Sequence, residues 1–320
     1  FTAFLLLFSG VLTVSAQVED EPIKIETTIV RLNVGVANRS GNPVKNLNKD
    51  NFAIYEDGVK QEILKFEPTV TPFSVVMILD MSGSTLSFRQ TIQQAAYRFV
   101  DALAPDDRIA VIEFYDKVNL LNDFTTNRKT IAHSITVANG RGKTQLYRAL
   151  NFSLDKLAGE GNRRKAVIVL TDGVDTDVRE KDRLFLENVK EADMVTAIKP
   201  ETSEILNNIL NRADAQGVTI YPLALPTGDP SKLAEPTPIQ VAMYTAARSR
   251  LQTLASRTGG TLNAINRLEE LGRFYAGVAA DIRALYTIEY QPLNDKRDGK
   301  WREIKIEVNN TELITRTRQG

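Results

Sequence analysis

The chain has 320 residues, enough for one large domain or two smaller ones that each bury a hydrophobic core. Lysine and arginine number 40, and aspartate and glutamate also number 40, so the formal charge is zero; this balance argues against a general nucleic-acid binder, which usually carries a basic excess. The absence of cysteine excludes disulfides, thiolate metal sites and cysteine nucleophiles.

The chain begins with an apolar block from Phe1 to Val14, followed by Ser15 and Ala16. This pattern is typical of a secretory signal peptide, so we predict that residues 1–16 are cleaved off before Gln17. An uncleaved membrane anchor is the alternative, although the block is shorter than the roughly 20 residues that a span requires. We therefore expect an exported protein, periplasmic or extracellular, with no membrane span in the mature chain. The lack of cysteine favours a bacterial envelope over an animal extracellular space.

Residues 25–70 have the pattern of antiparallel strands. Apolar side chains alternate with polar or small ones at Val30, Leu32, Val34 and Val36, the period of a half-buried strand. Asp57-Gly58 lies between two further apolar segments and predicts a tight hairpin.

Residues 72–286 have a different pattern. Unbroken apolar runs are separated by segments with helical spacing; the runs are "VVMIL", "IAVIEF", "AVIVL" and "VTIYPLAL". Strands buried on both faces that alternate with helices indicate an α/β fold with a doubly wound, mostly parallel sheet. The segment 178–215 holds more helix than one crossover needs, which predicts an insertion there.

Residues 287–320 return to the β pattern, with a turn at "PLNDKRDG" and a returning strand around Ile304, Ile306 and Val308. The simplest interpretation is one small antiparallel β-sandwich made by both ends of the chain, with the α/β domain inserted into it. The alternative is two unrelated small sheets, each marginally stable because two or three strands bury little surface.

Polar side chains follow two of the buried runs. Asp80, Ser82 and Ser84 come directly after "VVMIL", and Asp172 follows "AVIVLT", while Thr144 begins a predicted helix. Ligands of open parallel sheets bind outside the carboxyl ends of the strands, near the point where the strand order reverses. Carboxylates and hydroxyls are hard oxygen donors that suit Mg²⁺.

At this point the chain resembles the von Willebrand factor A domain family. "DMSGS" matches the Asp-x-Ser-x-Ser motif of that family, whose metal-ion-dependent adhesion site takes a threonine and an aspartate from two further loops. By order and context these are Thr144 and Asp172, so the resemblance implies a complete metal site: Asp80, Ser82, Ser84, Thr144 and Asp172. It covers residues 72–286, and both flanks resemble the exported von Willebrand-related proteins of Acidobacteria.

The resemblance also implies a function. In the family, Mg²⁺ (with Mn²⁺ or Ca²⁺ as alternatives) leaves one coordination position for an acidic residue of a partner protein. We therefore expect a binding module that uses a partner's Asp or Glu side chain, and no nucleic-acid partner. A structural scaffold with metal-independent association is the alternative.

Two other metal or phosphate motifs, and an enzyme function, fit the sequence less well. "GRGKT" lacks the first glycine of a phosphate-binding loop, since Val137 stands there, and "DGVDTDVREKD" lacks the central glycine and final glutamate of a calcium loop. We expect no enzyme activity, because Ser82 and Ser84 have no predicted general base: His133 is the only histidine and is distant in sequence from every motif.

Overall fold

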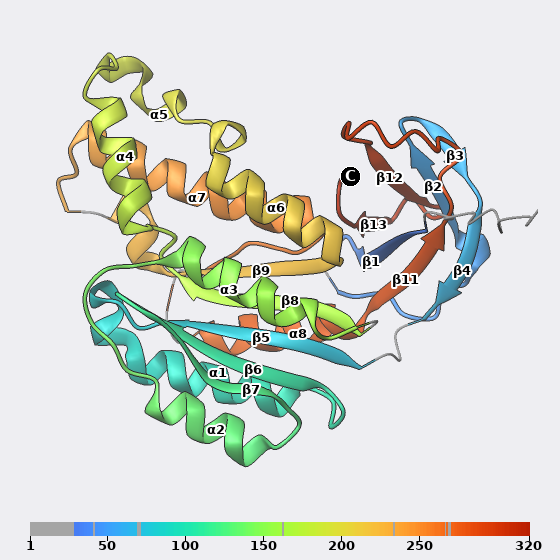
Figure 1. The fold of residues 1–320 in the computed structure, drawn as a ribbon, viewed down its shortest axis with the longest axis horizontal. Coiled ribbons are helices and arrows are strands. Elements are labelled where there is room, and N and C mark those ends of the chain that lie inside the picture. The colour runs from blue at the N-terminus through green and yellow to red at the C-terminus, as the bar shows by residue number, and fades with distance from the viewer. Residues whose placement is uncertain are drawn as a thin grey trace, which may run out of the picture.

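The computed structural model describes residues 29–320 except 41, 69–71, 162, 233, 266 and 268–269. The predicted signal peptide therefore lies outside the described residues. The chain forms an α/β unit with a central sheet and, at one end of it, a smaller unit of β-strands (Figure 1). Within the described part of the chain, no helix combines the length and the apolar character that a membrane crossing requires.

The central sheet has six strands in the order β10-β9-β8-β5-β6-β7. They are β5 (Phe73–Asp80), β6 (Arg108–Phe114), β7 (Val118–Thr125), β8 (Arg164–Thr171), β9 (Val218–Ala224) and β10 (Asn263–Ala264). All neighbours are parallel except β7, which forms an antiparallel hairpin with β6. The predicted mostly parallel sheet is confirmed.

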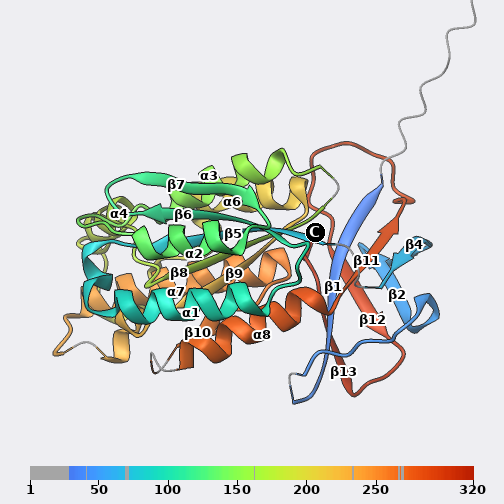
Figure 2. The same ribbon diagram turned by 90° about the horizontal axis from the view of Figure 1, so that it is seen from below.

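Helices cover both faces of this sheet (Figure 2). One face carries α1 (Arg89–Ala102), α2 (Arg128–Val137) and α8 (Leu271–Arg283); the other carries α3 (Leu146–Ala158), α6 (Glu204–Gln216) and α7 (Pro238–Thr258). All eight residues of β5 are buried. Because successive side chains of a strand point to opposite faces, Val75 and Met77 belong to the core on one face of the sheet, and Val76 and Ile78 belong to the core on the other. This double burial explains the unbroken apolar run.

The predicted insertion consists of α4 (Thr176–Leu186), α5 (Met194–Ala197) and the start of α6. Short 3-10 helices complete the α/β unit: η2 (Gly83–Phe88), η3 (Glu191–Asp193), η4 (Pro200–Thr202), η5 (Pro226–Gly228) and η6 (Pro230–Lys232). Figure 1 shows α4 and α5 at the end of the molecule away from the β unit.

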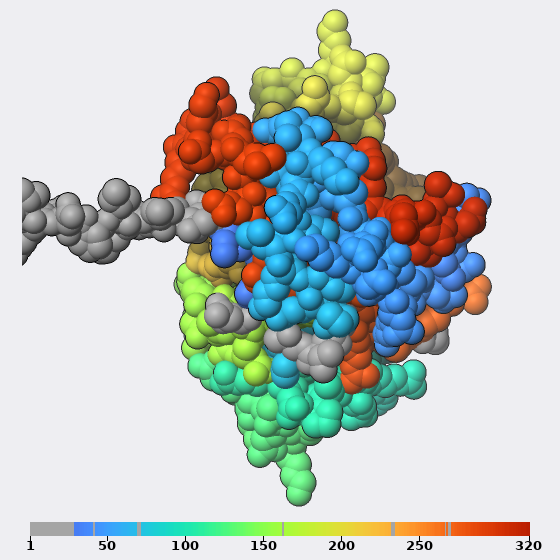
Figure 3. Space-filling model, turned by 90° about the vertical axis from the view of Figure 1, so that its right-hand side faces the viewer, coloured from blue at the N-terminus to red at the C-terminus, as the bar shows by residue number. Residues whose placement is uncertain are grey.

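Both ends of the chain build the β unit. One sheet has the order β13-β1-β11-β4 and the other β12-β2-β3, with every pair antiparallel. The strands are β1 (Val30–Asn38), β2 (Phe52–Glu56), β3 (Val59–Gln61), β4 (Ile63–Glu67), β11 (Leu285–Tyr290), β12 (Ile304–Val308) and β13 (Leu313–Arg316), with η1 (Lys49–Asn51) before β2. Figure 3 shows the early and late segments intermingled on this face.

The two sheets share one core, in which Leu32 pairs with Ile288 and Ile54 pairs with Ile306. The alternative of two unrelated sheets is therefore wrong. The α/β unit is attached through β4–β5 on one side and α8–β11 on the other. Arg164 strengthens the junction, because its guanidinium donates to Thr287 Oγ1 (3.0 Å) and to the Leu285 carbonyl (2.9 Å). Since β5 starts beside the sandwich, its carboxyl end faces away from it.

Candidate metal centre

The strand order creates a crevice at the carboxyl end of β5. Strand β5 lies between β6 and β8, because the chain continues from β5 to β6 on one side and later adds β8 on the other side. The strand order therefore reverses at β5, where open parallel sheets bind their ligands. Helix α2 packs on one face of the sheet and α3 on the opposite face, so the segment 138–145 must cross the carboxyl edge. The Gly83 N–H donates to the Gly142 carbonyl at 3.1 Å, which joins this crossing to the loop after β5.

Gly142 suits the crossing for a steric reason. Its φ is +97°, in the region that disfavours side chains, and a Cβ there would collide with the Asp116 carboxylate. The Asp116 carboxylate in turn accepts a hydrogen bond from the Lys143 N–H (2.6 Å). The backbone of the crossing is thus held close to the end of β6.

Asp80 ends β5 and is fully buried. One oxygen, Oδ1, accepts from the Ser82 N–H (3.0 Å), and the other, Oδ2, accepts from the Thr171 hydroxyl (2.9 Å). The hydroxyl oxygens of Ser82 and Ser84 lie 3.1 Å apart, and Thr85 closes the turn by donating to the Asp80 carbonyl (2.8 Å). Three of the predicted ligands therefore come together in one tight turn.

Asp172 follows β8 directly and is 5% exposed. Its Oδ1 accepts from the Val174 N–H (3.0 Å), which fixes the carboxylate over its own loop. Gly228 in η5 packs against the Asp172 backbone so closely that a Cβ would overlap the Asp172 carbonyl. The loop after β9 thus supports the loop that carries Asp172.

Thr144 is buried beside the same loop. Its N–H donates to Thr176 Oγ1 (2.9 Å), and the Thr176 N–H donates to the Thr144 carbonyl (2.9 Å). Asp175 caps α4 and also accepts from the Tyr147 N–H (3.3 Å) at the start of α3. The structure therefore brings Thr144 to the edge through its backbone, while Ser82 and Ser84 meet through their hydroxyls and Asp80 accepts from the Ser82 backbone N–H.

The electrostatics of the two carboxylates fit a divalent cation. Burial and, to a lesser extent, the nearby charge of Asp172 together raise the pKa of Asp80 to about 7. Burial also raises the pKa of Asp172, which hydrogen bonds from the Val174 N–H and Ser84 partly oppose. Two buried negative charges that repel one another would be stabilised by a cation between hard oxygen donors, so the residues fit Mg²⁺.

The donor set depends on hydroxyls as well as on carboxylates. Among the described residues, no group of three or more His, Cys, Asp or Glu side chains could hold a metal ion. The candidate centre has two carboxylates, and Ser82, Ser84 and Thr144 supply its other side-chain oxygens. A low count of charged ligands is typical of weakly bound Mg²⁺ that keeps some of its waters.

Sequence reasoning missed residues that hold this centre in place. Thr171 and Thr85 bind Asp80, and Arg89 donates to the Met81 carbonyl (2.9 Å) at the same edge. Burial lowers the pKa of Arg89, as does the charge of Arg141, whereas the charge of Asp80 raises it. Thr171 directly precedes Asp172 at the end of a buried strand, and this position in the sequence could have identified it as part of the centre. The sequence around Arg89 contains no comparable pattern.

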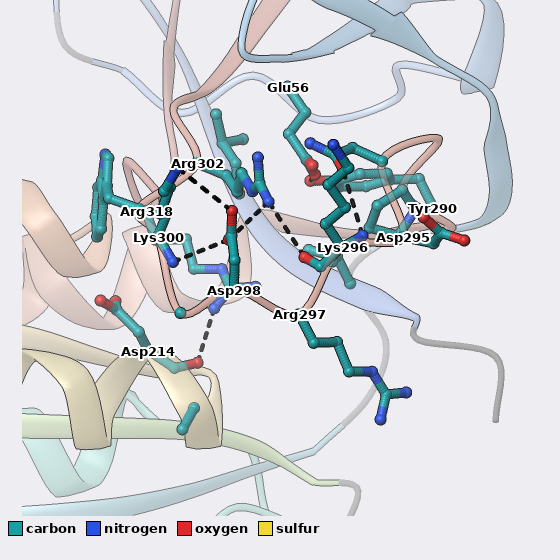
Figure 4. A pocket seen from close by; sticks show the side chains of 18 of the residues that line it. Glu56, Asp214, Tyr290, Asp295, Lys296, Arg297, Asp298, Lys300, Arg302 and Arg318 are labelled. Carbon is teal, nitrogen blue, oxygen red and sulfur yellow. Dashed lines mark hydrogen bonds and ion pairs between the residues drawn. The ribbon is translucent and has the colours of Figure 1, made fainter.

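Apart from the candidate metal centre, the structure has a cavity of about 910 Å³ between α6 and the segment 291–302 (Figure 4). Three of its cationic side chains have partners in its wall: Lys300 and Arg302 both contact Asp298, and Arg318 donates to the Asp214 carbonyl (2.7 Å). The cavity lies at the junction with the sandwich, away from the metal loops. The first two contacts lie within the segment 291–302, and the third joins the C-terminal end of the chain to α6.

Comparison with known proteins gives a family match. Residues 75–174 match the model of the von Willebrand factor type A domain. An uncharacterized protein from Synechocystis sp. is 30% identical over 106 residues, which are 32% of this chain and 25% of that protein. The chain thus matches a quarter of the length of this curated relative.

Solved structures with similar folds have low sequence identity. A von Willebrand factor type A protein from Catenulispora acidiphila is 14% identical, with 81% of this chain and 51% of that chain covered and a TM-score of 0.49. The vWF domain of the type V pili tip protein Mfa5 from Porphyromonas gingivalis is also 14% identical, with 65% and 94% covered and a TM-score of 0.49.

Proposed function

Because residues 75–174 match the model of the von Willebrand factor type A domain, we propose that the chain is a metal-dependent protein-binding module of the bacterial envelope or secreted fraction. Its partner presents an Asp or Glu side chain to the centre at the end of β5. The exported location rests on the N-terminal sequence pattern. The binding function rests on the oxygen donors gathered at the carboxyl edge of the sheet.

Each residue of the centre has a distinct role in this proposal. Asp80 and Asp172 neutralise the charge of Mg²⁺, and the hydroxyls of Ser82, Ser84 and Thr144 complete its protein ligands. The bound ion supplies a Lewis-acid position for one carboxylate oxygen of the partner. Thr171 holds Asp80 in its orientation, as partners of metal ligands commonly do.

A further observation, the charge around these donors, supports an acidic partner. Arg89 lies at the same edge, and the exposed side chains of Arg141 and Lys143 stand on the crossing segment. Arg179 lowers the pKa of Asp172 through its charge. Exposed Asp116 and Asp177 lie on the same loops, but these four cations outnumber them. With the two carboxylates of the centre balanced by a divalent ion, the surface therefore favours an acidic group over a basic one.

We also propose that the centre binds and does not catalyse. The hydroxyls of Ser82 and Ser84 contact one another, and His133 is exposed on α2. The serine hydroxyls therefore serve as ligands in this proposal, since a nucleophilic serine needs a base within hydrogen-bonding reach.

The test combines metal titration with selection of peptides. Calorimetry with Mg²⁺ should give one site in the wild-type chain and none in Asp80→Asn, whereas the exposed neighbour Asp177→Asn should bind normally. Random peptides displayed on phage, bound in Mg²⁺ and eluted with EDTA, should share an acidic residue that is essential for binding. Peptides that stay bound in EDTA, or that tolerate replacement of every Asp and Glu, would favour the scaffold function instead.

A further inference from the structure

Exposed apolar side chains concentrate in one part of the fold. Of the 12 large apolar residues that are exposed in the described chain, four lie between residues 184 and 205: Leu184 (51%), Phe185 (52%), Val195 (46%) and Ile205 (38%). Single exposed apolar residues are ordinary on a protein surface, whereas a group of them marks an interaction site. All four belong to α4, the insertion and the start of α6.

Two of these residues, Phe185 and Ile205, stand at a cavity of about 730 Å³. Its wall also includes the apolar side chains of Val178, Ala197 and Ile198. This volume lies within the range of about 300–1,000 Å³ that is common for ligand pockets. The cavity can therefore take a bulky apolar side chain together with part of the segment that carries it.

The charges of the cavity do not select an ion. Arg250 and Asp182 form a two-pronged ion pair at its wall, with distances of 2.6 and 2.7 Å, and both are buried. The exposed rim has two cations, Arg148 and Lys181, and two acids, Asp177 and Glu204. Asp175 is one further acid of the wall, and its carboxylate already accepts from backbone N–H groups of α3 and α4. Because the remaining opposite charges balance, burial of apolar surface is the main gain available to an occupant.

The cavity shares its wall with the metal loops. Gln145, which lines the cavity, directly follows the metal ligand Thr144 in the chain. Asp175, also in the wall, is three residues after Asp172, and three residues span at most about 11 Å. Thr176 bonds to the backbone of Thr144, so the two loops form one continuous surface.

We propose that this cavity is the second anchor of the partner site. The occupant is an extended segment of a partner protein, with an acidic residue at the metal centre and a bulky apolar residue two to four positions away, in the cavity. Two to four residues of extended chain span about 7–14 Å, and the upper bound of about 11 Å between Asp172 and Asp175 falls within this range. This inference rests on the proposed metal-dependent function and adds the specificity of the partner.

The phage-displayed peptides described above test the inference directly. Sequences selected on the wild-type chain in Mg²⁺ should contain a Leu, Ile, Phe or Trp two to four positions from the essential acid. The double variant Phe185→Ser/Ile205→Ser should bind these peptides about tenfold more weakly or worse, because the apolar contact is lost. Leu64→Ser is the matched control, since Leu64 is equally exposed (52%) but lies on β4 of the sandwich.

The outcomes separate this inference from the proposed function. The double variant should keep wild-type Mg²⁺ affinity by calorimetry, and peptides selected on it should still need an acid but lose the apolar preference. Acid-dependent peptides without any apolar preference on the wild type would overturn the second anchor and leave the metal function intact. A wild-type dimer in sedimentation that the double variant abolishes would also overturn it, since the patch would then bind a second copy of the chain.

Discussion

Thr171 donates a hydrogen bond of 2.9 Å to Asp80, and this bond links the ends of two neighbouring strands, β8 and β5. The same hydroxyl oxygen accepts from the Gly173 N–H at 3.1 Å. One threonine therefore connects the carboxylate of the first loop with the backbone of the loop that carries Asp172. Its position makes the relative placement of the two carboxylates of the proposed centre, Asp80 and Asp172, depend on the pairing of β5 with β8.

The first prediction concerns this link. Thr171→Val keeps the shape of the side chain but removes the donor to Asp80, so we expect Mg²⁺ affinity to fall by about tenfold. Calorimetric titration measures the change. Thr219→Val is the control, because Thr219 is a buried threonine of the next strand, β9, near its opposite end. Unchanged affinity in Thr171→Val would show that Asp80 needs no support from β8.

The second prediction concerns the cost of the buried charge in metal-free protein. Burial and Asp172 raise the pKa of Asp80 from 3.8 to about 7. The folded state then binds this proton more tightly than the unfolded state, so the free energy of unfolding falls as pH rises from about 4 to about 7. In EDTA at pH 8, Asp80→Asn should therefore raise the melting temperature by about 2–5 °C.

The pH dependence provides the control for this prediction. At pH 5 the folded wild type holds a proton on Asp80, so the advantage of Asp80→Asn should shrink. Asp177→Asn, which removes an exposed acid, should melt like the wild type at both pH values. Calorimetric scans in EDTA give the melting temperatures of all three proteins. An Asp80→Asn variant that melts at a lower temperature than the wild type at pH 8 would contradict the prediction that the buried Asp80 charge destabilises the metal-free fold.

The third prediction separates metal binding from partner binding. If Thr144 joins the metal only when a partner is bound, Thr144→Ala should change Mg²⁺ affinity by less than about threefold. The same variant should bind the acidic peptides at least about tenfold more weakly. Thr130→Ala on α2 is the exposed control. An equal loss in both assays would place Thr144 among the permanent ligands.

The fourth prediction concerns the shared sandwich. Removal of residues 287–320 deletes β12, β13 and most of β11, which lies between β1 and β4 in its sheet. Leu32 and Val34 of β1 would lose their cover, so we expect aggregation or loss of cooperative unfolding. Size-exclusion chromatography and calorimetry measure this. A monomeric truncated chain with the melting temperature of the full chain would refute the dependence of the two ends on each other.

Much of the α/β unit could be predicted from local patterns. A strand buried on both faces needs apolar residues at every position, as in β5 and β8, and a surface helix needs an apolar stripe, as in α3. Asp80, Ser82 and Ser84 were recognisable because they interrupt such a run at its end. Thr144 and Asp172 were named from their order and context in the chain, and their placement at one edge followed from the rule for parallel sheets.

The tertiary structure alone decided which distant segments meet. Alternation in β1 shows which face is buried but cannot name its partners, and β1 in fact pairs with β11 and β13, about 250 to 280 residues later. Thr171 acts on Asp80 only because β8 lies beside β5, and the cavity at Phe185 exists only because the insertion folds over α3 and α7. Periodicity records the burial of one residue at a time, whereas these contacts depend on the order in which strands and helices pack.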